Sequence, residues 1–256
     1  ELDGDALGEA IAAYEALSDL LGRISSYAQL LHAGAMDDAA VAQFFQNTSE
    51  QVNAITTDIL FFTLEINRIA EDVLGERLEA PKLRAYAPWV RDTRAYCDHQ
   101  LADDMEMLLH EKRVSGASSW IRLFDETMAG LRFPYDGREL TEEEALHLLS
   151  DPDRGVRRAA AQSLSGVFAA NIRLLGLVTN TLAKDKETED RWRHFAAPPN
   201  ARHLANFVEP EVVEALVDAV KSSYPALAHR YYAMKAGWLG LDKLEYWDRN
   251  APLPDD

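Results

Sequence analysis

The stretch QVNAITTDILFFTLEINRIAEDV, residues 51–73, decides the fold class. Its apolar side chains recur three and four residues apart, the spacing of one helix face, at Val52, Ile55, Ile59, Phe62, Ile66, Ile69 and Val73. Phe61 and Leu64 widen this face, and a wide apolar face favours burial in a helical bundle over a two-stranded coiled coil. We therefore predict a long helix here, in an all-α protein.

An earlier segment has the same spacing and predicts a partner for this helix. Its apolar positions are Leu7, Ile11, Tyr14, Leu17, Leu21, Ile24, Ala28 and Leu31. The region around Gly34, with Asp37 and Asp38, ends this helix and begins the next. The expected architecture is a multi-helix bundle of long antiparallel helices.

The middle of the chain predicts shorter elements and one turn of a different kind. Prolines 81 and 88 disfavour helical geometry in the residue before each, so short segments are expected over 82–99, followed by helices over 102–113 and 117–130. Over 131–140, Asp136-Gly137 supplies the positive φ of a tight turn and predicts one small β-hairpin. Thr141 and Glu144 then have the spacing of a capping box. We place a boundary here, which gives domains 1–130 and 131–256.

The last part of the chain predicts two further long helical stretches. Asp151-Pro152-Asp153 opens the first, which has an apolar surface from residue 159 to 178 and Arg154, Arg157 and Arg158 on a solvated surface. Residues 197–200, Ala-Pro-Pro-Asn, form a break. The final stretch covers 210–239, and Pro225 should kink or divide it.

Composition excludes several classes of function. The 256 residues are 47% hydrophobic, enough for a sizeable core, and 43 acidic residues against 26 basic ones give a net charge of −17, which repels nucleic acid and anionic membranes. The single cysteine, Cys97, excludes an internal disulfide and is expected to be a small buried apolar residue. The most hydrophobic stretch, 59–64, is broken by Glu65 and Asn67, so no membrane span is expected. We expect a soluble, cytoplasmic protein.

Three motifs resemble chemical sites but are incomplete. His110-Glu111 begins like the zinc motif His-Glu-x-x-His, but Val114 stands where the second histidine is needed. Glu144-x-x-His147 has the spacing of a di-iron motif, but only one copy is present. Residues 116–118, Gly-Ala-Ser, lack the second glycine and the preceding strand of a nucleophile elbow. We predict no catalytic, cofactor-binding or metal-binding residue in this chain.

Several segments, taken in order, resemble the oligoendopeptidase F branch of the thimet-oligopeptidase-like zinc metallopeptidases. The amino-terminal ones are Tyr14-Glu15, ISSYAQL at 24–30, LFFTLEI at 60–66 and the segment from Glu106 to SGASSWIRL at 115–123. The later ones are DRGVRRAA at 153–160, RYYAMKAGWLGL at 230–241, YWD at 246–248 and APL at 251–253. The resemblance covers nearly the whole chain and lies in the order of the segments.

The resemblance implies a function for a longer protein. The family binds zinc through a His-Glu-x-x-His helix and a downstream glutamate, and the motif's glutamate activates the water that attacks a peptide bond. In relatives these residues lie beyond the point that matches Asp256, so the chain corresponds to a helical amino-terminal domain plus the first helices of the catalytic domain. It would form one wall of a channel for short peptides, with zinc bound only by the full-length protein.

Two hypotheses from different classes follow. The first is an amino-terminal portion of a zinc oligoendopeptidase that is inactive alone, and the second is a non-enzymatic helical binding or scaffold protein built on the same fold. A portion of a larger fold would also expose an apolar face and could self-associate.

Overall fold

The structure is a computed structural model that describes residues 2–254. Those residues are mostly helical and contain one antiparallel sheet of two strands, which confirms the all-α fold with a small hairpin. The chain forms two compact units: Glu1–Arg122 with Leu182–Phe207, and Leu123–Thr181 with Val208–Asp256. Each unit thus takes two separate stretches of sequence. The boundary expected after Gly130 concerns the family's domains and stays a prediction.

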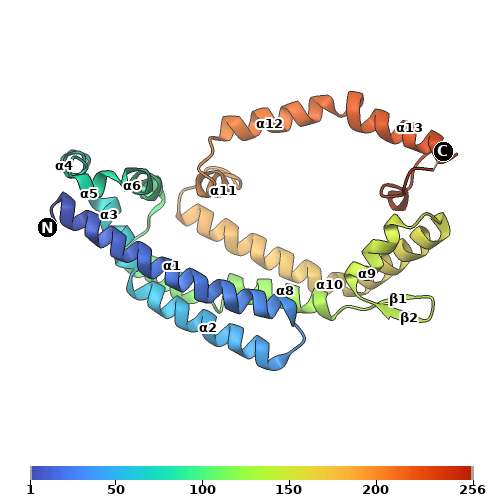
Figure 1. Cartoon of the computed structure of the whole chain (residues 1–256), viewed down its shortest axis with the longest axis horizontal. Helices are drawn as coiled ribbons and strands as arrows, with labels where there is room; N and C mark the ends of the chain where they lie inside the picture. Colours follow the sequence, from blue (N-terminus) through green and yellow to red (C-terminus); the bar gives the residue numbers. More distant parts are fainter. Residues whose placement is uncertain (1, 255–256) are drawn as a thin grey trace. The chain divides into compact units, whose positions relative to one another are not determined.

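The first unit is built on a pair of long helices, α1 (Gly4–Gly34) and α2 (Ala39–Asp58), which lie side by side (Figure 1). Each begins at an aspartate whose carboxylate accepts from a backbone N–H, Asp3 from Ala6 and Asp38 from Ala40 and Val41. The other helices of the unit are α3 (Leu60–Arg68), α4 (Glu71–Arg77), α5 (Pro81–Arg84), α6 (Ala87–Arg94), η1 (Cys97–His99), α7 (Asp103–Lys112) and α11 (Asn200–Ala205). The unit also contains the first residues of α8 (Ala117–Gly130) and the last of α10 (Arg154–Trp192).

The long helix predicted over residues 52–73 is interrupted, so the prediction of one continuous element was wrong. Helix α2 ends at Asp58, α3 begins at Leu60, and a second break follows Arg68. Just before the first break, the hydroxyls of Thr56 and Thr57 donate back to the carbonyls of Val52 and Asn53. Such back-bonding competes with the backbone ladder and bends helices, which apolar spacing alone does not reveal.

The core of the first unit lies where α1 meets the short helices. Its buried members are Leu7, Ile11, Ile66, Leu74, Leu83 and Val90. The positions predicted at the start of α1 are therefore core, whereas Ile24 and Leu31, on the predicted face further along, are exposed. Close packing at the start of α1 uses glycine, because a Cβ on Gly8 would lie 2.7 Å from the carbonyl carbon of Lys82.

The second unit is built around a hairpin and the first part of α10. Strands β1 (Phe133–Tyr135) and β2 (Arg138–Leu140) pair antiparallel, and Asp136 (φ 49°) and Gly137 (φ 74°) form the predicted turn. Helix α9 (Glu142–His147) begins at the predicted capping box of Thr141 and Glu144. Phe133, Leu140, Ala145 and Leu164 form the buried core. The remaining elements are η2 (Leu148–Ser150), α12 (Pro210–Ser223), the π-helical turn η3 (Pro225–His229), α13 (Arg230–Trp238) and η4 (Tyr246–Asp248).

A buried ion cluster closes the second unit and corrects a prediction about α10. Arg157 was expected on a solvated surface, but only 3% of its side chain is exposed, and its Nη2 donates to Asp248 Oδ1 at 3.0 Å. Arg154 donates to the same fully buried carboxylate from Nε and Nη2, at 3.0 and 2.8 Å. Burial would raise the pKa of Asp248, but hydrogen bonds from Arg154, the Glu245 amide and Arg157 outweigh it and lower this pKa to about 2.

Helices α10 and α12 expose long apolar surfaces. Helix α10 is long and apolar enough, by length and composition, to cross a membrane, and little of its apolar stretch is buried. One such helix is weak evidence of a membrane span, because helices of soluble proteins pass the same test. Helix α12 presents Val212, Leu216 and Val220 four residues apart, and all three side chains are exposed.

Candidate functional site

The first unit contains a cavity of about 730 Å³ formed by two stretches that are distant in sequence. One runs from α3 through η1 to α7, and the other comprises the end of α10, the loop that follows it, and α11. This volume is in the range of small-molecule and cofactor pockets. The cavity is therefore the candidate functional site.

Arg94 fixes the first stretch by capping the end of α3. Its Nη1 donates to the carbonyl oxygens of Ile66 and Ile69, at 2.8 and 2.9 Å. The Ile66 carbonyl also accepts from the Ile69 amide at 3.3 Å, and carbonyls at a helix C-terminus are well suited to a cationic donor. Arg94 also forms an ion pair with Glu71. Asn67, which lines the cavity, donates from Nδ2 to Gln100 Oε1 at 2.9 Å, and its Oδ1 is buried without a hydrogen-bond partner among residues 2–254.

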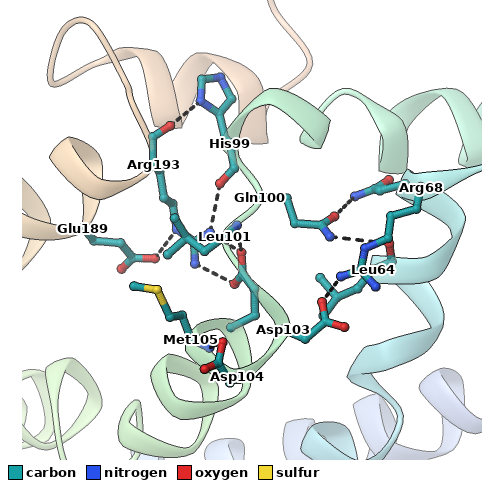
Figure 2. Close-up of polar contacts among 12 residues, drawn as sticks. Leu64, Arg68, His99, Gln100, Leu101, Asp103, Asp104, Met105, Glu189 and Arg193 are labelled. Carbon is teal, nitrogen blue, oxygen red and sulfur yellow. Dashed lines mark hydrogen bonds and ion pairs between the residues drawn. The ribbon is translucent and has the colours of Figure 1, made fainter.

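Arg193 joins the second stretch to the first (Figure 2). Its guanidinium donates from Nη1 and Nη2 to the two oxygens of Glu106, at 2.7 and 2.9 Å. Its Nε donates to Glu189 at 2.7 Å. Nη1 also lies 3.2 Å from the His99 carbonyl oxygen. Such a bidentate pair fixes direction as well as distance. Arg193 therefore sets the position of the loop that forms one side of the cavity.

The imidazole of His99 strengthens the same junction. Its Nδ1 lies 2.7 Å from the Arg193 carbonyl oxygen and must carry the proton, because a carbonyl only accepts. The ring stacks on Phe195, with centroids 3.8 Å apart and planes inclined by 19°. Figure 2 shows His99 and Arg193 facing each other across this junction. The two stretches are thus tied by an ion pair, a hydrogen bond and a ring stack.

The ion pair at this junction is stable at neutral pH. Burial raises the pKa of Glu106, but hydrogen bonds from Arg193 and the Leu101 amide and the charge of Arg193 hold it below its ordinary value. The hydrogen bond to Glu106 is the largest cause of the raised pKa of Arg193. Both groups are therefore ionised.

The lining of the cavity is acidic and aromatic. Four carboxylates line it, at Asp92, Glu106, Glu189 and Asp190, against two cations, at Lys186 and Arg193. The aromatic members are Trp89, Tyr96, Phe195 and Phe207. The lining thus has an excess of negative charge beside apolar ring faces.

Phe207 occupies an unusual backbone position at this cavity. Its φ is 49°, in the left-handed region, just after α11 and its cap residue Asn206. Glycine is the usual residue there, because a side chain in this conformation costs about 1–2 kcal/mol. The Phe207 side chain is 57% exposed, so burial in the core does not offset that cost.

The motif residues of the sequence analysis lie elsewhere and do not come together. His110 Nε2 is 2.8 Å from Thr56 Oγ1, and Glu144 caps α9 next to His147. Cys97 is partly buried and donates to the Asn67 carbonyl, and burial raises the pKa of its thiol. Among residues 2–254, no three His, Cys, Asp or Glu side chains are grouped as a metal site requires. The described residues therefore do not fit zinc.

Sequence reasoning missed the cavity. Its lining comes from residues 63–67, 89–106 and 186–207, and no local spacing connects these stretches. The available signal was the charge pattern KDKETEDRWR at 184–193, which has the alternating sign of a solvated helix face. Nothing in it identifies Glu106 as the partner of Arg193.

Comparisons with known proteins relate this chain to peptidases. Residues 65–133 match the family model described as Oligopeptidase F. The chain is 26% identical over 249 residues to group B oligopeptidase PepB of Streptococcus agalactiae serotype III (strain NEM316), covering 93% of this chain and 40% of that protein. It is also 26% identical over 265 residues to oligopeptidase PepF of Bacillus subtilis (strain 168), covering 98% and 38%.

The fold agrees with a solved structure. The crystal structure of oligoendopeptidase-F from Enterococcus faecium superposes with a TM-score of 0.87 and 23% identity, covering 98% of this chain and 51% of that one. The chain spans about 40% of the length of the curated relatives that it matches. In sequence and in fold, this chain is similar to the amino-terminal portion of oligoendopeptidase F-type proteins, which confirms the resemblance found in the sequence.

Proposed function

We propose that this chain is the amino-terminal portion of a zinc-dependent oligoendopeptidase that hydrolyses short peptides in the cytoplasm. The observation that carries the proposal is the similarity to PepB and PepF, which extends over at least 93% of this chain and through both compact units. A non-enzymatic protein could share a fold, but the relatives that share this sequence are oligopeptidases.

The chain's own part in this function is to shape the peptide channel. The described residues bring no metal-ligand set together, so we derive no chemical step from them. The cavity of the first unit offers ring faces and carboxylates to a ligand, as a peptide-contacting wall requires. The zinc site of the full-length protein would come from residues outside this chain.

A cleavage assay tests whether this chain can cleave peptides without the rest of the full-length protein. The purified 256-residue chain is incubated with zinc and short quenched-fluorescent peptides, and we expect no cleavage above a blank purified in the same way. Zinc-dependent cleavage that follows the chain through every purification step would contradict the proposal.

The coding sequence separates the two hypotheses. The enzyme hypothesis requires a His-Glu-x-x-His motif in frame after Asp256, because zinc needs two histidines one helical turn apart. A natural stop codon directly after Asp256 would favour the non-enzymatic helical binding or scaffold protein.

We further propose that the chain self-associates when produced alone. The exposed apolar side chains of α12 and η3, among them Leu216 and Leu227, would be covered by a second copy. Light scattering across a concentration series should show mass increasing with concentration. A constant monomer mass at the highest concentration would count against self-association.

A further inference from the structure

The cavity of the first unit has a charge balance that selects among ligands. Four carboxylates and two cations line it, which leaves an excess of two negative charges. Both cations are already engaged within the protein. Arg193 is held by Glu106 and Glu189, and Lys186 is paired with Asp190 and donates to the Pro198 carbonyl at 2.9 Å. An anionic ligand would meet no free positive charge on this lining.

Three of the carboxylates keep an oxygen available. Among residues 2–254, each accepts hydrogen bonds at one oxygen only. Asp92 Oδ1 accepts from Arg91, Glu189 Oε1 accepts from Arg193, and Asp190 Oδ2 accepts from Lys186. The second oxygen of each accepts no hydrogen bond from residues 2–254. The exposed fractions of these side chains are 31%, 47% and 15%, so their field is screened less than that of a fully solvated carboxylate.

The aromatic members suit the same kind of ligand. Trp89, Tyr96, Phe195 and Phe207 belong to the lining, and an aromatic face attracts an ammonium or a guanidinium. Phe207 keeps its side chain in a left-handed conformation that glycine adopts without cost. A ring held in this conformation at the lining is placed where it can contact a ligand.

We infer that the cavity binds the cationic group of a peptide, an ammonium or a guanidinium, between the carboxylates of Asp92, Glu189 and Asp190 and the aromatic rings. The inference rests on the proposed function for the peptide nature of the ligand. Two sources offer the same chemistry, the peptide's amino terminus and a lysine or arginine side chain.

The test compares three octapeptides that carry the same neutral fluorophore. The first is acetylated and has norleucine at its centre, the second replaces norleucine by lysine, and the third has norleucine and a free amino terminus. Fluorescence polarisation with the full chain should give about tenfold tighter binding of one or both cationic peptides than of the neutral one. The tighter of the two identifies the source of the cation.

Charge-removing variants locate the effect. Asp92→Asn and Asp190→Asn should each weaken binding of the cationic peptide about three- to tenfold and leave the neutral peptide unchanged. Glu143→Gln removes one negative charge from an exposed position on α9 and is the matched control, expected to change neither. Equal binding of neutral and cationic peptides, or an Asp190→Asn variant that behaves like Glu143→Gln, would overturn the inference.

Phe207→Gly guards against a trivial loss of folding. This variant relieves the left-handed strain, so its melting temperature should not fall, while its affinity for the cationic peptide should fall severalfold. Unchanged affinity in Phe207→Gly would show that the Phe207 ring does not contribute to binding of the cation.

Failure of the inference is distinguishable from failure of the proposed function. Benzylamine, a cation that is not a peptide, is titrated in parallel. Peptide binding that ignores charge overturns the inference and leaves the proposed function standing. Binding of benzylamine that depends on Asp190, without binding of any peptide, supports a cation site and contradicts the peptide function.

Discussion

Each unit joins distant parts of its sequence through an arginine and a carboxylate, yet the two clusters differ in exposure. In the second unit Asp248 is fully buried, and 3% of the Arg157 side chain is exposed. In the first unit Glu106 and Arg193 are 12% and 19% exposed and border a cavity of about 730 Å³. The same bidentate chemistry thus closes a core in one place and frames a site in the other. The two clusters use the same residue types and differ in burial.

The largest expected effect is loss of the buried carboxylate. Asp248→Ala leaves Arg157 as an unpaired buried charge and should lower the free energy of unfolding by about 3–5 kcal/mol. Urea denaturation followed by circular dichroism measures it. Asp242→Ala removes an exposed carboxylate from the same segment and should change stability by less than about 0.5 kcal/mol. Similar losses in both variants would show that the cluster is not structural.

Lowering the pH should weaken the contribution of Asp248 to stability over a defined pH range. The pKa of Asp248 is about 2 in the folded protein against an ordinary 3.8. A lowered folded pKa stabilises above the ordinary value, and this stabilisation is lost as pH falls through the folded pKa. The stability difference between the parent and Asp248→Asn should therefore be constant above about pH 5 and shrink toward pH 2. A difference that grows on acidification would contradict this assignment.

The junction beside the cavity should be less costly to break. Glu106→Ala removes the bidentate partner of a partly solvated arginine and should cost about 1–3 kcal/mol, below the effect of Asp248→Ala. Glu111→Ala on the same helix removes an exposed carboxylate and serves as the control. A larger loss of stability in Glu106→Ala than in Asp248→Ala would contradict the expectation that the more deeply buried cluster contributes more.

The smallest expected effects come from one helix cap in each unit. Asp38→Ala on α2 and Thr141→Ala on α9 should each cost about 1 kcal/mol, because each side chain accepts from orphan amides of the first turn. Asp38→Asn and Thr141→Ser keep an accepting oxygen and should be nearly neutral. Thermal melting distinguishes them, and an asparagine as damaging as alanine would exclude capping as the cause.

Local signals predicted the elements that depend on neighbouring residues. The turn at Asp136-Gly137, the capping box at Thr141 and the division of the last helical stretch at Pro225 all follow from residues within a few positions of one another. In these places the sequence pattern and the structure obey the same short-range physics.

Long-range partners could not be predicted in this way. Arg157 has the spacing of a surface residue on α10, and its partner Asp248 lies 91 residues further on. Arg193 and Glu106 are 87 residues apart, so the cavity between their stretches has no local signature. The break at Ile59 was missed for a different reason, because the back-bonding of Thr56 and Thr57 is invisible to a count of apolar residues.

The apolar stripe of α12 has a consequence for the folding and degradation of the protein in the cell. Val212, Leu216 and Val220 form it, and their side chains are 55%, 63% and 41% exposed. While a protein is being synthesised, chaperones bind exposed apolar surfaces of this kind, and such surfaces also promote aggregation. Degradation of the protein would then depend on how quickly other parts of the folded protein bury this stripe. Substitutions on α12 would therefore change the amount of protein in the cell even where they leave activity unchanged.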